Sequence, residues 1–176
     1  MANSYCAAVR RGIDDWNKVY HDTEYGFLLR DDNELFERLI LEINQAGLSW
    51  LTILKKRESF KKAYDGFDLQ KVAAYTEDDR ARLLGNAGII RNRLKVNAAI
   101  VNAQRIIELG GFAQWLDANH PQDLTGWSKL FKKTFVFTGG EIVREFLVST
   151  GYVDGAHDEE CPIYQEAVMK RPPWMK

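Results

Sequence analysis

One acidic residue stands inside an apolar helical segment of this chain. Glu42 lies within Leu39–Arg57, which reads LILEINQAGLSWLTILKKR and breaks at Gly47. At about 100° per residue, Glu42 falls at the margin of the apolar stripe, where a carboxylate is partly removed from water. Such a carboxylate can bind a cation or a hydrogen-bond donor. The alternative is an edge residue that pairs with Arg38 one turn earlier.

The two cysteines and two of the three histidines have a distribution that suits a metal site. His157 and Cys161 are four residues apart, while Cys6 and His21 lie near the other end of the chain. The two thiolates of a Cys2His2 set would neutralise Zn²⁺, and the ion would tie the two termini together. Because the gap from Cys6 to His21 matches no standard zinc knuckle, two core cysteines and two surface histidines remain an open alternative.

A glycine-containing turn at 86–90 is followed by Arg91, Arg93 and Lys95. Two helices joined by such a turn, with exposed N–H groups at the start of the second, suit a DNA phosphate. The cationic side chains would release counterions from DNA. The alternative is a helical corner with a solvated basic face.

The segments that position these residues are almost all helical by pattern. Asp31 and Glu34 form a capping signal for a helix that begins near Asp32, and Ser49 can cap the next helix, where Trp50 either packs in the core or stacks on a ligand. Only TFVFT at 134–138 reads as a strand, 121–133 is less regular, and the tail after Gly151 reads as a loop. The pattern predicts helices at about 32–46, 50–64, 69–75, 77–86, 92–109, 112–119 and 141–149.

Composition sets the broad class. The 176 residues fit one domain, or two small lobes that share a core, and the hydrophobic fraction of 45% is that of an ordinary globular protein. A net charge of −1 gives no global basic field, so any DNA contact must come from one local face. No apolar run is long enough to span a membrane, and no signal peptide is evident. We therefore expect a cytoplasmic protein without a disulfide.

Together these segments resemble the DNA-3-methyladenine glycosylase I family, within the helix-hairpin-helix DNA glycosylase superfamily. The similarity runs from Cys6 to about Cys161. Its most specific blocks, in chain order, are YHD from Tyr20, EYG from Glu24, QAGLSW from Gln45, LKKRE from Leu54 and AGIIRNR from Ala87.

The resemblance implies an all-α fold of two helical lobes, with the base pocket in the cleft between them. It implies one DNA glycosylase domain over 1–176, with the helix-hairpin-helix at about 77–109, acting as a monomer. It also implies one structural Zn²⁺ that joins the N- and C-terminal segments. Its ligands would be Cys6, His21, His157 and Cys161.

By position, Glu42 corresponds to the catalytic pocket acid, and Tyr20 and Trp50 to aromatic walls; Tyr25 sits where the family usually has Trp. A cationic N3-alkylated adenine suits aromatic faces and a carboxylate acceptor, once it is flipped out of double-stranded DNA. We expect hydrolysis of its N-glycosidic bond, leaving an abasic site, without a lysine Schiff base. The expected DNA-contacting residues are Gly88, Ile89, Ile90, Arg91, Arg93 and Lys95.

The chain also departs from the family pattern. Asn17 occupies a position that tends to be aromatic, and GEIVREF after Gly139 places Glu141, Arg144 and Glu145 near an expected wall of the pocket. Two alternatives follow: the same fold with a different alkylpurine preference, or a non-catalytic protein that binds damaged DNA.

Overall fold

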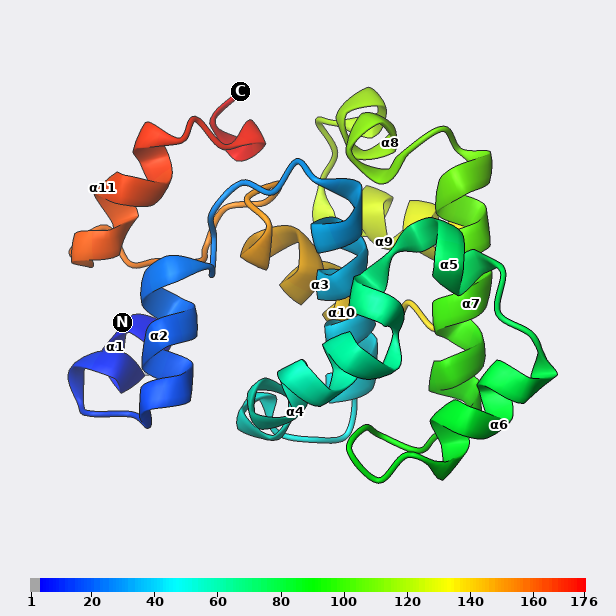
Figure 1. Ribbon diagram of the computed structural model, residues 1–176. Helices are drawn as coiled ribbons and strands as arrows, with labels where there is room; N and C mark the ends of the chain where they lie inside the picture. The colour runs from blue at the N-terminus through cyan, green and yellow to red at the C-terminus, as the bar shows by residue number, and fades with distance from the viewer. Residues whose placement is uncertain (1–3) are drawn as a thin grey trace.

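The computed structural model describes residues 4–176, and within that range all regular secondary structure is helical (Figure 1). The all-α prediction is therefore confirmed. The α-helices are α1 (Tyr5–Arg10), α2 (Asp15–Thr23), α3 (Asp32–Gln45), α4 (Trp50–Ala63), α5 (Leu69–Ala73), α6 (Glu77–Gly85), α7 (Arg93–Glu108), α8 (Phe112–Asn119), α9 (Leu124–Thr134), α10 (Gly140–Ser149) and α11 (Pro162–Met169), and two 3₁₀ turns are η1 (Asp65–Phe67) and η2 (Pro173–Met175).

Helix α3 runs through the middle of the molecule (Figure 1). It begins at the predicted cap, where the Asp31 side chain accepts hydrogen bonds from the amides of Asn33 and Glu34. Helices α4, α5, α7, α8 and α10 all pack against it. Every residue from Leu35 to Asn44 is buried as a result, including the polar ones. The sequence pattern predicts one apolar stripe, whereas the structure surrounds this helix on several sides.

A sharp turn separates α3 from α4. Gly47 has a φ of +81°, a backbone conformation that glycine adopts without strain. Ser49 then caps α4 as predicted, because its side chain accepts a hydrogen bond from the amide of Thr52. This turn brings Trp50, the first residue of α4, back toward α3 and Glu42.

The predicted strand at 134–138 is wrong. The segment that follows α9 is an irregular turn, and its backbone bonds to a side chain instead of a second strand. The Asn102 amide accepts from the Val136 N–H at 2.9 Å and donates to the Val136 carbonyl at 3.0 Å. A buried asparagine on α7 thus satisfies the groups that a neighbouring strand would have satisfied.

Two less regular segments are also more helical than predicted. The 121–133 segment contains α9, which Asp123 caps through the amide of Gly126. The tail contains α11, which has Pro162 at its first position. Proline suits that position because its missing N–H would be unpaired there in any residue.

The N-terminal helices α1 and α2 and the C-terminal segment that contains α11 lie on the same side of α3 (Figure 1). The Ser4 hydroxyl donates to Asp158 at 2.6 Å, and the Gly26 amide donates to the Ser149 carbonyl at 2.9 Å. At Gly26 a Cβ atom would lie 2.4 Å from the Cβ of Ala156, so only glycine permits this approach. In residues 4–176, no helix combines the length and apolar character that a bilayer crossing needs.

Candidate functional site

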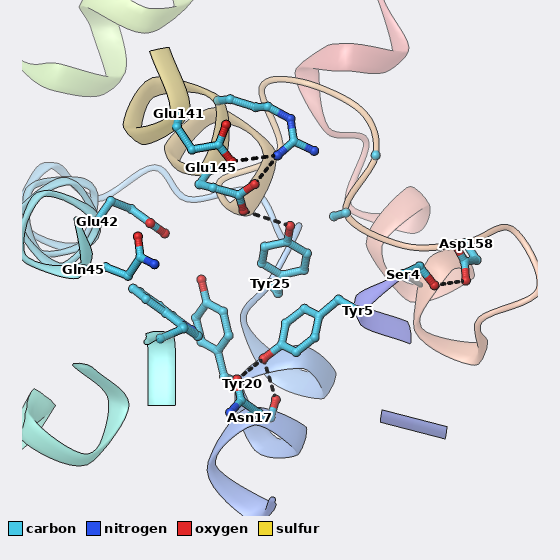
Figure 2. Close-up of a pocket in the computed structure, with 14 residues that line it drawn as sticks. Ser4, Tyr5, Asn17, Tyr20, Tyr25, Glu42, Gln45, Glu141, Glu145 and Asp158 are labelled. Atoms are coloured by element: carbon cyan, nitrogen blue, oxygen red, sulfur yellow. Dashed lines mark hydrogen bonds and ion pairs between the residues drawn. The ribbon is translucent and has the colours of Figure 1, made fainter. Parts of the chain in front are cut away.

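A cleft of about 630 Å³ opens between α2, α3, the start of α4 and α10 (Figure 2). All four residues predicted to contact the base line it, together with Asn17 and the three charged residues of α10 that the sequence places near this wall. This volume is ample for one purine. The lining residues are Ser4, Tyr5, Asn17, Tyr20, Tyr25, Glu42, Gln45, Trp50, Glu141, Arg144, Glu145, Gly155, Ala156 and Asp158.

The Glu42 carboxyl points into this cleft and is 5% exposed (Figure 2). Within residues 4–176 it makes no hydrogen bond or ion pair. The alternative pairing with Arg38 is wrong, because that guanidinium donates to Glu24 at 3.2 Å and to the Ser149 carbonyl at 3.2 Å. A buried carboxyl without a partner is costly, which indicates that a ligand supplies the missing one.

The environment of Glu42 favours its protonated form. Burial raises the pKa of the Glu42 carboxyl to about 8, the nearby Arg38 charge opposes that rise, and the charges of Glu145 and Glu141 add to it. A strongly shifted carboxyl in a cleft is typical of a functional site. The entry of a cation would reverse the effect and stabilise the ionised form.

Aromatic rings form the walls beside Glu42. The Tyr20 ring lies 5.1 Å from that of Trp50 and 5.8 Å from that of Tyr25, measured between centroids. The indole N–H of Trp50 is buried without an acceptor. The Tyr20 hydroxyl likewise lacks a hydrogen bond of ordinary geometry, although the Ser149 hydroxyl is close enough to interact with it. The site therefore offers flat aromatic faces and one acidic group to a ligand, and two buried donors lie beside them.

Sequence reasoning missed Tyr5 and Gln45 as residues of this cleft. The Tyr5 ring lies 5.2 Å from the Tyr25 ring, and its hydroxyl donates to the backbone and side-chain oxygens of Asn17 at 2.9 Å. Tyr5 thus supplies an aromatic surface next to Asn17, at a position where the resemblance predicts an aromatic residue. Its place directly before Cys6 is the one sequence signal that could have identified it.

The predicted metal ligands come together behind this aromatic wall. Cys6, His21, His157 and Cys161 are all buried, and their ligand atoms lie within 4.8 Å of one another. The Cys6 sulfur is 3.2 Å from His21 Nε2 and 3.6 Å from His157 Nδ1, and the two nitrogens are 3.2 Å apart. Tetrahedral Zn²⁺ would place such N and S atoms roughly 3.3–3.8 Å apart. This Cys2His2 group can hold a metal ion.

The outer nitrogens of both histidines are also fixed. His21 Nδ1 lies 2.7 Å from an Asp22 oxygen, and His157 Nε2 lies 2.7 Å from the Tyr25 carbonyl. Donation to these acceptors leaves the lone pairs of the two inner nitrogens facing the sulfurs, as in metal sites with an ordered outer shell. Burial raises the pKa of the Cys6 thiol to about 11, so a bound cation is what would stabilise its thiolate.

The predicted DNA-contacting residues follow α6 but differ in exposure. The Asn86 side chain accepts from the Gly88 amide at 2.8 Å, and Asn92 caps α7. Ile89 is buried, whereas Arg91 and Arg93 are exposed. Within the described chain, neither the Ile90 amide nor the Arg91 amide donates a hydrogen bond. Free amides beside cations are suited to an anion.

Lys95 points inward instead. Its ammonium donates to the carbonyls of Asn44 at 2.9 Å and Ala46 at 2.7 Å, and the residue is 5% exposed. Its charge therefore stabilises the carbonyl end of α3. Lys56 of α4 likewise donates to the Ala87 carbonyl at 3.2 Å, which fixes the turn to the helix that carries Trp50.

Comparisons with known proteins agree with this geometry. The sequence profile of the family described as methyladenine glycosylase matches residues 11–125. DNA-3-methyladenine glycosylase 1 of Escherichia coli (strain K12) is 37% identical over 169 aligned positions, which cover 83% of this chain and 90% of the relative. The DNA-3-methyladenine glycosylase of Haemophilus influenzae is 37% identical over 166 positions, which cover 81% of this chain and 89% of that relative.

Solved structures show the same likeness. The 3-methyladenine DNA glycosylase I from Staphylococcus aureus superposes with a TM-score of 0.78 at 35% identity, covering 85% of this chain and 92% of that chain. A variant of 3-methyladenine DNA glycosylase I in complex with 3-methyladenine gives a TM-score of 0.80 at 33% identity, covering 93% of this chain and 97% of that chain.

The buried acid makes stability depend on pH. The pKa of the Glu42 carboxyl is about 8 in the folded protein against 4.5 ordinarily, so the folded state holds a proton that the unfolded state has released. The free energy of unfolding therefore falls as pH rises from about 5 through 8. We expect Glu42→Gln to raise it by roughly 1–3 kcal/mol at pH 8.5 and much less at pH 5.

Urea unfolding of wild type and variant at both pH values measures this. The control is Glu34→Gln, at an exposed position of the same helix, which should change stability little at either pH. An equal effect of Glu42→Gln at pH 5 and pH 8.5 would contradict a raised pKa.

Proposed function

The chain belongs to the methyladenine glycosylase family, and from this premise we propose that it hydrolyses the N-glycosidic bond of 3-methyladenine in alkylated DNA. The observation that carries the proposal is the unpartnered Glu42 carboxyl, buried in a cleft beside the rings of Tyr20, Tyr25 and Trp50. Adenine methylated at N3 is a cation with a donor amine. It supplies both the charge and the hydrogen bond that Glu42 lacks.

Recognition follows from these groups. The ionised Glu42 carboxylate accepts a hydrogen bond from the exocyclic amine and is attracted to the ring charge. The electron-rich faces of Tyr20 and Trp50 attract the same cation. A neutral adenine would leave the Glu42 carboxyl protonated and would gain no charge attraction, so the cleft favours the cationic base over undamaged bases. Because the base edge is inaccessible in a duplex, the nucleotide must first be flipped out.

Little further catalysis is required of the protein. The glycosidic bond breaks with its electron pair moving to the positively charged base, which leaves as a neutral molecule. Water adds to the sugar carbon and loses one proton, and an abasic site remains. Among the described residues, no lysine lines the cleft, which supports simple hydrolysis over a covalent Schiff base.

We infer that the α6–turn–α7 unit is the helix-hairpin-helix that holds the DNA backbone. The free amides of Ile90 and Arg91 and the guanidinium groups of Arg91 and Arg93 supply donors and positive charge. We further infer that the Cys2His2 group binds one Zn²⁺. Cys6, His21, His157 and Cys161 would hold it, and the ion would join the chain ends without taking part in the reaction.

One observation favours a second candidate function. The cleft has three charged side chains of α10 and Asn17 in its lining, and the resemblance in sequence predicts a departure from the family pattern at these positions. These favour an enzyme of the same reaction with a different preference among alkylated purines.

Loss of the acid should remove base release. We expect the wild type to release free 3-methyladenine from methylated DNA, and Glu42→Gln to lower kcat/KM roughly 30- to 100-fold, or about 2–3 kcal/mol. Chromatography of the released bases measures both, with Glu34→Gln as the matched control. Undiminished release by Glu42→Gln would refute this role for Glu42.

The metal can be tested apart from activity. We expect close to one zinc per chain by elemental analysis, and its loss in His157→Ala together with at least ~3 kcal/mol of stability, or roughly 6–12 °C in Tm. His120→Ala removes the one histidine outside the group and should keep the zinc. A wild type that is fully folded and free of metal would overturn the assignment.

Arg91 offers a test of the DNA surface. Because each phosphate contact releases counterions, Arg91→Ala should reduce the slope of log K against log salt by about 0.9 and weaken binding to all sequences alike. Lys129→Ala, at an exposed position on α9, should leave the slope unchanged. An unchanged slope in Arg91→Ala would place the turn outside the interface.

A further inference from the structure

The cleft contains a second acid that faces it from another helix. Glu145 of α10 lies half-buried at the wall that faces Glu42 and Gln45 (Figure 2). One of its oxygens accepts a hydrogen bond from the Tyr25 hydroxyl at 3.3 Å, and the other pairs with Arg144. The carboxylate that faces the cleft therefore also fixes the position of the Tyr25 ring through this hydrogen bond.

Acidic side chains outnumber basic ones in the lining of the cleft. Its charged lining consists of four carboxyl groups, from Glu42, Glu141, Glu145 and Asp158, and one guanidinium, from Arg144. Asp158 is offset by Arg10, at 3.3 Å, whereas Glu141 and Glu145 share Arg144. Arg38 also lies near Glu42, but it is committed to Glu24 and a backbone carbonyl. The excess of carboxyl groups over cations favours a nucleotide whose base carries positive charge.

A simple surface ion pair does not account for Glu145. The side chain of Arg144 is 47% exposed, so its charge is largely screened by water, whereas that of Glu145 is 29% exposed and is turned toward Tyr25. A carboxylate has about four acceptor sites, and its bonds to Arg144 and Tyr25 leave capacity for a ligand. Burial raises the pKa of Glu145, as it does for Glu42, so both carboxylates become more stable when a cation enters.

We propose that Glu145 is a specificity-determining residue of the base pocket: with Glu42 it forms a pair of facing carboxylates that selects purines bearing a formal positive charge. This inference rests on the proposed function and deepens it. The two carboxylates would attract a cationic base from two sides, whereas Glu42 alone would attract it from one edge. The substrate class it names is the cationic N-alkylpurines.

Two small ligands of similar shape but different charge can separate the effect of charge on binding from the effect of shape. The 3,9-dimethyladeninium ion carries a permanent charge, with the 9-methyl group in place of the sugar, and 9-methyladenine is its neutral counterpart. NMR titration of the full-length protein with each ligand gives two dissociation constants for every variant. Their ratio reports the preference for charge and is insensitive to a general loosening of the pocket.

We expect the wild type to bind the cation more tightly than the neutral base. Glu145→Gln should weaken cation binding about fivefold to tenfold and change binding of 9-methyladenine by less than about twofold. Tyr25→Phe keeps the Glu145 charge but removes the hydroxyl, so it should preserve the ratio. Glu34→Gln, away from the cleft, should change neither constant.

A proportional loss of both affinities in Glu145→Gln, or no loss of either, would overturn the proposal. A wild type with no preference for the cation would instead count against the proposed function itself. Thermal melting of each variant confirms that the comparison is made between folded proteins.

Discussion

The structure depends on one unfavourable arrangement, which is a carboxyl group kept from water without a partner of its own. Removing a charged or polar group from water costs free energy unless something compensates for it. The fold isolates Glu42 by surrounding α3 with other helices and by directing Arg38, the nearest cation, to Glu24 and Ser149. The result is a site that prefers a proton in the absence of ligand and a cation in its presence.

The Cys2His2 group and the cleft share their chain segments. Tyr5 precedes Cys6, Tyr20 precedes His21, and the Tyr25 carbonyl accepts the hydrogen bond of His157. Each of these tyrosines faces the cleft, while its neighbour or partner belongs to the Cys2His2 group. Fixing the four ligands therefore also fixes three walls of the pocket. This coupling explains how short helices near the chain ends can hold rings firmly beside Glu42.

Features with a local signal were predictable from the sequence. Asp31 and Ser49 cap their helices as expected. The residues predicted to contact the base form one group and the predicted metal ligands form another, because the family resemblance carried their positions. The predictions differ from the structure where a partner distant in sequence determines the conformation. Val136 bonds to Asn102 instead of a strand, and Lys95, which was predicted to contact DNA, donates to the carbonyl end of α3. Neither partner can be identified from residues nearby in sequence. A third difference is local: Pro162 begins a helix in a tail that was predicted to be a loop.

The ionisation state of Glu42, with and without a cation in the cleft, decides whether this carboxyl recognises charge. A ¹³C NMR titration of the Glu42 carboxyl, assigned by comparison with Glu42→Gln, can be recorded for the free protein and with the 3,9-dimethyladeninium ion bound. We predict a pKa of about 8 in the free protein and an ionised carboxylate at neutral pH once the cation is bound. A carboxyl that titrates near 4.5 in both states would contradict this prediction.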